Sequence, residues 1–195
     1  MAKPRPVHGL DPDRRIRPNA RRILAVRIDE VWSFEHAVVD PAAVTELHDM
    51  RIACKRLRYL LEIFDVAFDE PLEPYVEEVK GLQDLLGEIH DRDVQVPALE
   101  DHLRWLDERE AEAAQTLLAA AGRARGTADG GERAYRSFRR RFDAGRRADE
   151  RPGIVLLAAI LRRERAELYE RFLSEWRRLG EEGFRERLEG ALGLG

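Results

Sequence analysis

A row of basic side chains with the spacing of one helix face is the most chemically suggestive feature of this sequence. Its basic members recur at intervals of three and four residues, His48, Arg51, Lys55 and Arg58, and Glu62 ends the same row. At 100° per residue they lie along one side of an α-helix. No acidic residue occurs from 50 to 61, although a solvated helix face usually mixes both signs so that pairs form four residues apart. Stacked like charges cost stability, so the row predicts a site for an anion.

Two explanations of this row stay open. In the first, acidic side chains on neighbouring helices neutralise it. In the second, Arg51 and Arg58 bind phosphate oxygens with their forked guanidinium groups, Lys55 adds a point charge, and His48 adds a contact whose charge responds to pH. Basic residues on the helices before and after it extend the second hypothesis. The candidate anion-binding residues are then His48, Arg51, Lys55, Arg58, Lys80, Arg21 and Arg22.

Apolar periodicity predicts the helices that position this row. Residues such as Leu47, Met50, Cys54 and Leu57 form an apolar seam beside it, which is typical of an amphipathic helix packed in a bundle. No stretch has the alternation of a strand. We therefore predict an all-α fold, an antiparallel four-helix-bundle-type domain with an additional long C-terminal helix. The expected helices span about 18–39, 41–68, 72–89, 91–124, 132–147 and 153–180.

Turn and cap residues predict where these elements begin and end. Asp40 is expected to cap the second helix, with Pro41 at its first position, and Asp91 is expected to cap the fourth. Gly87 within the third helix costs about 1 kcal/mol relative to alanine, so we expect close packing there. The domain prediction is an extended N-terminal tail (1–15), a helical domain (16–180) and a C-terminal tail (181–195).

The bulk composition excludes several classes of protein. Of the 195 residues 37% are charged, yet the formal net charge is -4, so the chain is not a globally basic nucleic-acid binder. Tyr59 is the one aromatic beside the row, which leaves little for bases to stack on, although Arg139–Arg141 is a basic patch. Cys54 is the only cysteine, so no internal disulfide forms. No apolar run approaches the ~18 residues of a membrane span and no secretory signal is visible, so we expect a cytoplasmic protein.

The sequence contains little that would support a catalytic function. His48 and His90 would approach each other if their helices were antiparallel neighbours, but there is no HExxH motif and we predict no metal site. Phosphate-binding glycine loops are also missing, and Asp91 and Asp93 are better explained as helix-start residues than as magnesium ligands. We therefore expect a binding protein with no catalytic residues and no cofactor.

Three blocks of the sequence resemble the conserved histidine α-helical domain, the CHAD family. They are His48–Tyr59, Lys80–Asp91 and the weaker Leu157–Arg178, and the similarity runs from about Ile16 to Leu179. The resemblance implies an all-helical fold of two similar four-helix bundles around a basic pore that binds inorganic polyphosphate. It thereby implies polyphosphate as the partner and an association with polyphosphate granules. An alternative is a structural or interaction protein whose basic face binds an acidic protein or a nucleic-acid backbone.

One departure from the family concerns the histidine motif, which occurs in one clear copy here where a full member has two. The chain therefore resembles a single bundle, closer to the second half. Two ways of completing the pore stay open. A two-fold homodimer would bring two basic rows onto one polymer, or the basic segment 132–147, with Arg139, Arg140 and Arg141, would fold over the row within one chain.

Overall fold

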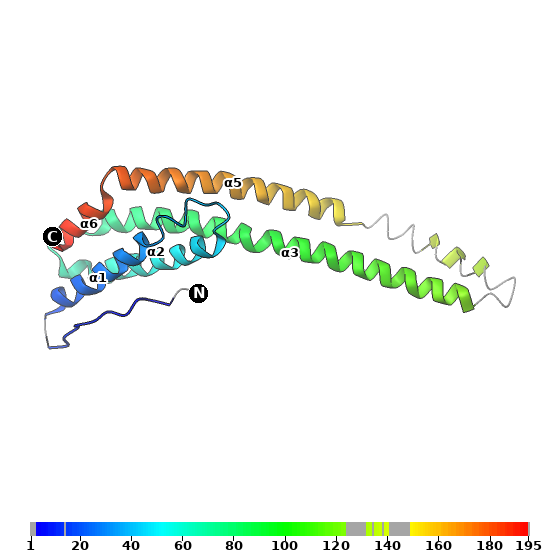
Figure 1. The fold of residues 1–195 in the computed structure, drawn as a ribbon, viewed down its shortest axis with the longest axis horizontal. Coiled ribbons are helices and arrows are strands. Elements are labelled where there is room, and N and C mark those ends of the chain that lie inside the picture. Colours follow the sequence, from blue (N-terminus) through cyan, green and yellow to red (C-terminus); the bar gives the residue numbers. More distant parts are fainter. Residues whose placement is uncertain are drawn as a thin grey trace. The chain divides into compact units, whose positions relative to one another are not determined.

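The computed structural model describes residues 3–13, 15–123, 132–133, 135–137, 139–140 and 149–194. Within these residues the regular structure is entirely helical (Figure 1), which confirms the all-α prediction. The elements are α1 (Ile16–Trp32), α2 (Val44–Phe64), the short 3-10 helix η1 (Asp65–Ala67), α3 (Glu73–Arg123), α5 (Arg151–Glu181) and α6 (Phe184–Leu192). Among the described residues, no helix has the length and hydrophobicity that crossing a bilayer requires.

The chain divides into two compact units. Unit 1 comprises Met1–Asp93 and Glu164–Gly195, and unit 2 comprises Val94–Arg163. Unit 1 holds a continuous apolar core to which α1, α2, α6 and the unit 1 parts of α3 and α5 contribute. Its largest fully buried side chains include Phe172, Phe184, Leu24, Ile28, Leu47, Met50, Leu57 and Leu61. The apolar seam predicted for the second helix is therefore a core-facing stripe, and Cys54 on it is fully buried.

The first two helices are shorter than predicted. The first ends at Trp32 and the second begins at Val44, with turns between them. Asp40 does not cap the second helix, because Ala43 is the N-cap residue and makes no side-chain cap hydrogen bond. The Oδ1 of Asp40 instead accepts a hydrogen bond from the N–H of Ala42 in the preceding turn, at 2.8 Å. The buried hydroxyl of Tyr169 donates to the carbonyl of Val38, at 3.0 Å. This long-range hydrogen bond holds the turn segment in place, and the periodicity of apolar residues does not predict it.

The third and fourth predicted helices are one continuous helix, α3, which corrects the break expected at Asp91. Asp91 lies exposed in mid-helix, and Asp93 pairs with Arg165 of α5, at 2.9 Å, instead of capping a helix. Pro97 is also accommodated inside α3. A proline in a helix removes one backbone hydrogen bond and favours a kink, and here that local penalty does not end the helix.

Residues 181–195 were expected to form a tail, but most of them fold into α6 and pack in the core of unit 1. Gly183 turns the chain with a left-handed backbone, φ 62°, which glycine adopts without steric cost. The side chains of Phe184, Leu188 and Leu192 are then fully buried. Phe184 stacks on Trp32 with ring centroids 5.8 Å apart. The helical domain therefore includes the segment that the sequence analysis placed outside it.

The N-terminal segment is extended, as predicted, and is attached to α1 by a buried ion pair. Arg27 and Glu30 are only 6% and 4% exposed, and their side chains meet at 2.6 Å. Arg27 donates to the backbone carbonyl of Arg5 at 2.5 Å, and the Arg5 N–H donates to Glu30. A buried charge is tolerated when it is paired and hydrogen-bonded, so the coil contributes to satisfying both groups.

Candidate anion-binding site

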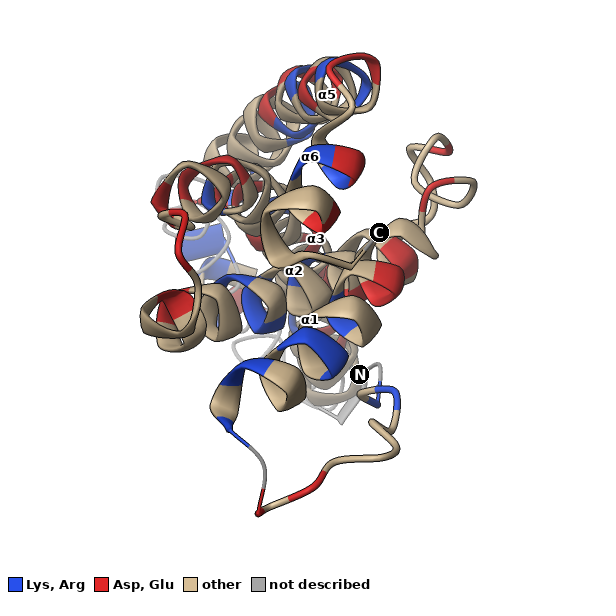
Figure 2. Cartoon of the chain, turned by 90° about the vertical axis from the view of Figure 1, so that its left-hand side faces the viewer, with Lys and Arg blue, Asp and Glu red and all other residues tan. Residues whose placement is uncertain are grey.

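Two rows of side chains face each other along α2 and α3. The basic row on α2 is His48, Arg51, Lys55 and Arg58, and the facing row on α3 is Lys80, Gln83, Gly87 and His90. Three contacts join them, and the residue number falls along α3 as it rises along α2, so the two helices run antiparallel here. In the end-on view of Figure 2, basic residues are seen on the ribbons of α1 and α2.

His48 and His90 form a close imidazole pair at one end of the rows. Their Nδ1 atoms are 3.2 Å apart and their ring centroids 4.3 Å apart. One ring must donate and the other accept, because a hydrogen bond needs one proton between the two nitrogens. Burial lowers the pKa of His48 below its ordinary value of 6.5, and the neighbouring His90 and Arg51 lower it further against an opposing effect of Asp49. The free site therefore favours the neutral imidazole at this end.

Arg51 lies directly over Gly87. The Nε of Arg51 is 3.4 Å from the position that a Cβ would occupy on Gly87, so an alanine there would be in close van der Waals contact with the guanidinium. That Nε is buried and has no hydrogen-bond partner among the described residues. Gly87 thus lies in close contact with the half-buried side chain of Arg51, which agrees with the close packing expected at this glycine. A buried donor without a partner is costly, and an anion at the row would lower that cost.

Arg58 and Lys55 surround Tyr59 at the other end. The guanidinium of Arg58 is 4.3 Å from the centre of the Tyr59 ring, and the Lys55 ammonium is 5.9 Å from it. Arg58 donates to Gln83 of α3 at 3.0 Å and to Glu62 of α2 at 2.6 Å. Its side chain is only 16% exposed, so its direction is set by these contacts. Lys55 is exposed to solvent.

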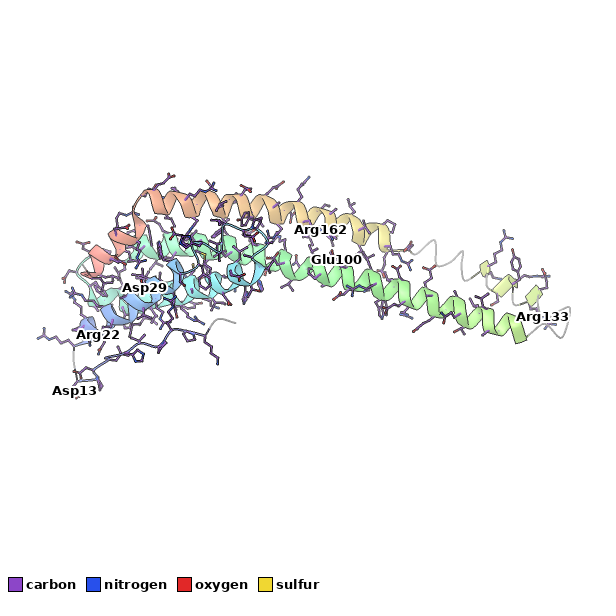
Figure 3. The ribbon with its side chains drawn as sticks, in the orientation of Figure 1. Asp13, Arg22, Asp29, Glu100, Arg133 and Arg162 are labelled. Atoms are coloured by element: carbon purple, nitrogen blue, oxygen red, sulfur yellow. The ribbon has the colours of Figure 1, made fainter. Side chains whose placement is uncertain are left out.

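The other three candidate residues, Lys80, Arg21 and Arg22, make contacts of different kinds. Lys80 belongs to the facing row and pairs with Glu77 of its own helix, at 3.4 Å. Arg21 donates to the carbonyl of Leu192 at 2.6 Å, and Arg22, labelled in Figure 3, donates to the carbonyl of Gly9. These bonds tie the C-terminal helix and the N-terminal coil to α1. In the described structure the contacts of Arg21 and Arg22 are thus structural, and neither involves the basic row.

Two carboxylates of α3 near the rows, Asp84 and Glu88, line a different surface. Asp84 and Glu88 border a pocket whose other wall is α5, with Arg171 and Glu175. The α3 residues that contact the basic row are instead an amide, a glycine and a histidine. The first explanation of the row, neutralisation by acids of the neighbouring helix, therefore does not describe the α2–α3 contacts. Glu62, on α2 itself, is the carboxylate bonded to Arg58.

The second basic candidate, the segment 132–147, is described only in part. Tyr135 is 58% exposed and Arg136 pairs with Glu132 at 3.1 Å. Arg139 and Arg140 are exposed. Phe138, Arg141, Phe142 and the rest of the predicted basic helix lie outside the described residues, so its placement over the row stays a prediction.

The candidate site residues did not include Gln83, His90 or Tyr59. The spacing of Lys80, Gln83 and Gly87 showed that they share a face of α3, and the approach of His90 to His48 was foreseen for antiparallel helices. The spacing of residues within each helix does not give the register between the two helices. That register depends on which core side chains interdigitate, and it decides which facing residue meets which cation.

An all-α domain with paired histidines and half-buried arginines along one helix–helix seam is a helical-bundle protein with a candidate anion-binding surface. A model of the CHAD domain matches residues 3–100, just over half of the chain, and covers both rows. The chain therefore belongs to the CHAD family. The similarity proposed for Leu157–Arg178 lies outside this match and stays a prediction. No curated protein and no solved structure matches the chain.

Proposed function

We propose that this protein binds inorganic polyphosphate through the basic row of α2. The observation that carries the proposal is the facing row of α3, which meets the cations with His90, Gly87 and Gln83 and leaves Arg51 with an unpartnered Nε. Family membership supports the same assignment. The proposal is for binding rather than catalysis, in the cytoplasm and at polyphosphate granules.

Polyphosphate suits this surface better than nucleic acid does. It is a flexible polymer of phosphates without bases, so it needs cations and no stacking partners. Tyr59 is the one aromatic side chain beside the row, 44% exposed and packed against Arg58, whereas single-stranded nucleic acid relies on several aromatic side chains on which successive bases stack. Forked guanidinium groups also match phosphate oxygens in pairs.

A competition experiment tests the proposal. Fluorescently labelled polyphosphate of several chain lengths is titrated with the protein, and unlabelled single-stranded DNA of matched charge is added as a competitor. We expect polyphosphate to bind and to be displaced far better by unlabelled polyphosphate than by DNA. Equal displacement by DNA would favour a general polyanion surface, and no binding at low salt would contradict the proposal.

The His48–His90 pair predicts a pH-dependent affinity. In the free protein the pKa of His48 is lowered, whereas a bound phosphate favours its charged form and raises its pKa in the complex. The added affinity is then complete below the free-state pKa and is lost as the pH rises through the bound-state pKa. Polyphosphate should bind more tightly as the pH falls from 8 to 6, which a titration at fixed ionic strength measures.

Replacing His48→Gln should flatten this pH dependence, because glutamine keeps hydrogen-bonding capacity and cannot be charged. His36→Gln is the matched control, since His36 is exposed on the turn segment after α1 and should leave the dependence unchanged. An identical pH response in the wild type and in His48→Gln would assign His48 a structural role.

A further inference from the structure

A groove lies on the surface of unit 1, between the end of α1 with the turn that follows it and the C-terminal part of α5. Its volume is about 310 Å³, and none of its residues belongs to the basic row. The residues that line it all lie in unit 1. They are Trp32, Glu35 and Val39 on one side, and Leu173, Trp176, Arg177, Gly180 and Glu181 on the other.

The inner surface of this groove is apolar. The rings of Trp32 and Trp176 lie with their centroids 5.4 Å apart. Leu173 and Trp176 are 7% and 8% exposed, and Val39 is 57% exposed. Gly180 lies near the middle of the α5 face that lines the groove, and a Cβ there would meet no atom within 4 Å. The groove is therefore open above its apolar surface, as is typical of a site for a small group.

The rim of the groove carries two carboxylates and one guanidinium. Glu35, Glu181 and Arg177 are exposed, and none of them forms an ion pair with another described residue. Arg177 precedes Glu181 by four residues on α5, but an exposed pair of this kind contributes little, least of all in the order basic before acidic. The rim therefore has an excess of negative charge that favours a cation.

Unit 1 shows how it holds a guanidinium at a neighbouring tryptophan. The Cζ of Arg185 lies 5.9 Å from the centre of the Trp32 ring, and Arg185 pairs with Asp29 at 2.5 Å and with Glu189 at 2.8 Å. Arginine suits such a place because its planar group packs on aromatic rings and binds carboxylates with its fork. Among the described residues no cation lies over the ring of Trp176. The groove thus offers a tryptophan and two carboxylates without an arginine.

We propose that this groove binds an arginine side chain of a partner polypeptide. The methylene stem packs on the two tryptophans and Val39, and the guanidinium meets Glu35 and Glu181 at the rim. Long basic side chains commonly cover apolar surface with their stems while the charged end stays in water. The proposal does not rest on polyphosphate binding, so either can fail without the other.

Nuclear magnetic resonance on the full, ¹⁵N-labelled chain tests the proposal. The probe is a short, capped alanine peptide with a single arginine, and the control peptide carries citrulline, which has nearly the same shape and no charge. The chain has three tryptophans, whose indole N–H signals are assigned with single Trp→Phe variants. We expect the arginine peptide to shift the signals of Trp32 and Trp176 saturably. The signal of Trp105, which is 45% exposed in unit 2, should not move.

Charge variants test the role of the rim. Glu35→Gln/Glu181→Gln should weaken binding of the arginine peptide by about tenfold, since each exposed ion pair contributes modestly. Glu70→Gln/Glu170→Gln is the matched control, because both residues are exposed in unit 1 outside the groove and the change in net charge is equal. Arg177→Gln should strengthen binding, because it removes the competing cation.

Filling the groove tests the role of its apolar surface. Gly180→Leu places a side chain in the groove and should abolish the saturable shifts. Gly190→Leu in α6 is the matched control, since a Cβ at Gly190 also meets no atom within 4 Å, and it should bind as the wild type does. Circular dichroism establishes that each variant keeps its helical content.

Four results would overturn the proposal. The first is no saturable shift at millimolar peptide, and the second is equal binding of the arginine and citrulline peptides. The third is an equal loss of affinity in Glu35→Gln/Glu181→Gln and in its control. The fourth is weaker binding in Arg177→Gln, which would mean that the groove takes an anionic group.

Discussion

Replacing both Arg51 and Arg58 by alanine is expected to weaken polyphosphate binding by about 100-fold or more at low salt, because hydrogen bonds to charged groups contribute roughly 1.5–3 kcal/mol each. The salt dependence should change as well. Each neutralised phosphate contributes about 0.7 to the log–log slope for a flexible single strand, so the loss of two cations should reduce the slope by about 1.4. Affinity measured across a salt series gives both quantities.

The fold should survive this double change. Arg51 lies over Gly87, and Arg58 bonds to Gln83 and Glu62, while the core side chains of α2 lie on the adjacent face. Arg104→Ala/Arg171→Ala is the matched control, since both residues are exposed and removing them changes the net charge equally. If the control loses as much affinity as Arg51→Ala/Arg58→Ala, binding follows overall charge and the basic row has no special role.

Truncating Phe184 to alanine is expected to lower the free energy of unfolding of unit 1 by about 3–5 kcal/mol. Its ring is 1% exposed, stacks on Trp32, and meets Tyr75 edge-on with centroids 5.8 Å apart. The substitution would leave a cavity where α6 joins α1 and α3. Since small domains unfold with about 5–15 kcal/mol, the loss would be a large part of the total. Guanidinium denaturation followed by circular dichroism measures it.

The control for this change is Val66→Ala, because Val66 is 87% exposed in η1 and its truncation should shift the unfolding midpoint very little. If Phe184→Ala is as stable as the wild type, α6 does not belong to the cooperative core. In that case the C-terminal residues behave as the tail that the sequence analysis predicted for 181–195.

Most of the correct predictions came from the local residue pattern of α2. Its seam and its basic row follow from helical geometry alone, and the core position of Cys54 and the exposure of Lys55 agree with that reading. Helix ends were harder. The continuity of α3 through Asp91 and Pro97 runs against the local cap and proline signals, and short-range sequence patterns do not predict it.

The sequence predicted which cationic residues belong to the candidate site, but it did not predict which groups these residues contact. Nothing in the spacing of Arg21 distinguishes it from Arg51, since both are arginines on one side of a helix. The difference arises 171 residues away, where the carbonyl of Leu192 accepts the hydrogen bond of Arg21. The same holds for Arg51, whose environment depends on the glycine that the register of α3 places beside it.

The ion pair beneath the N-terminal coil affects where this domain should be considered to begin. Arg27 and Glu30 bond to the backbone of Arg5, so the identity of that side chain is of little consequence for the contact. The flanking Pro4 and Pro6 lack an N–H and favour extended backbone, which leaves Arg5 as the one donor of the three. A recombinant truncation that starts at Ile16, the first helical residue, would remove this backbone, with its two hydrogen bonds, and open Arg27 and Glu30 to water. The irregular segment ahead of α1 is therefore part of the packed structure of this domain, although it has no regular secondary structure.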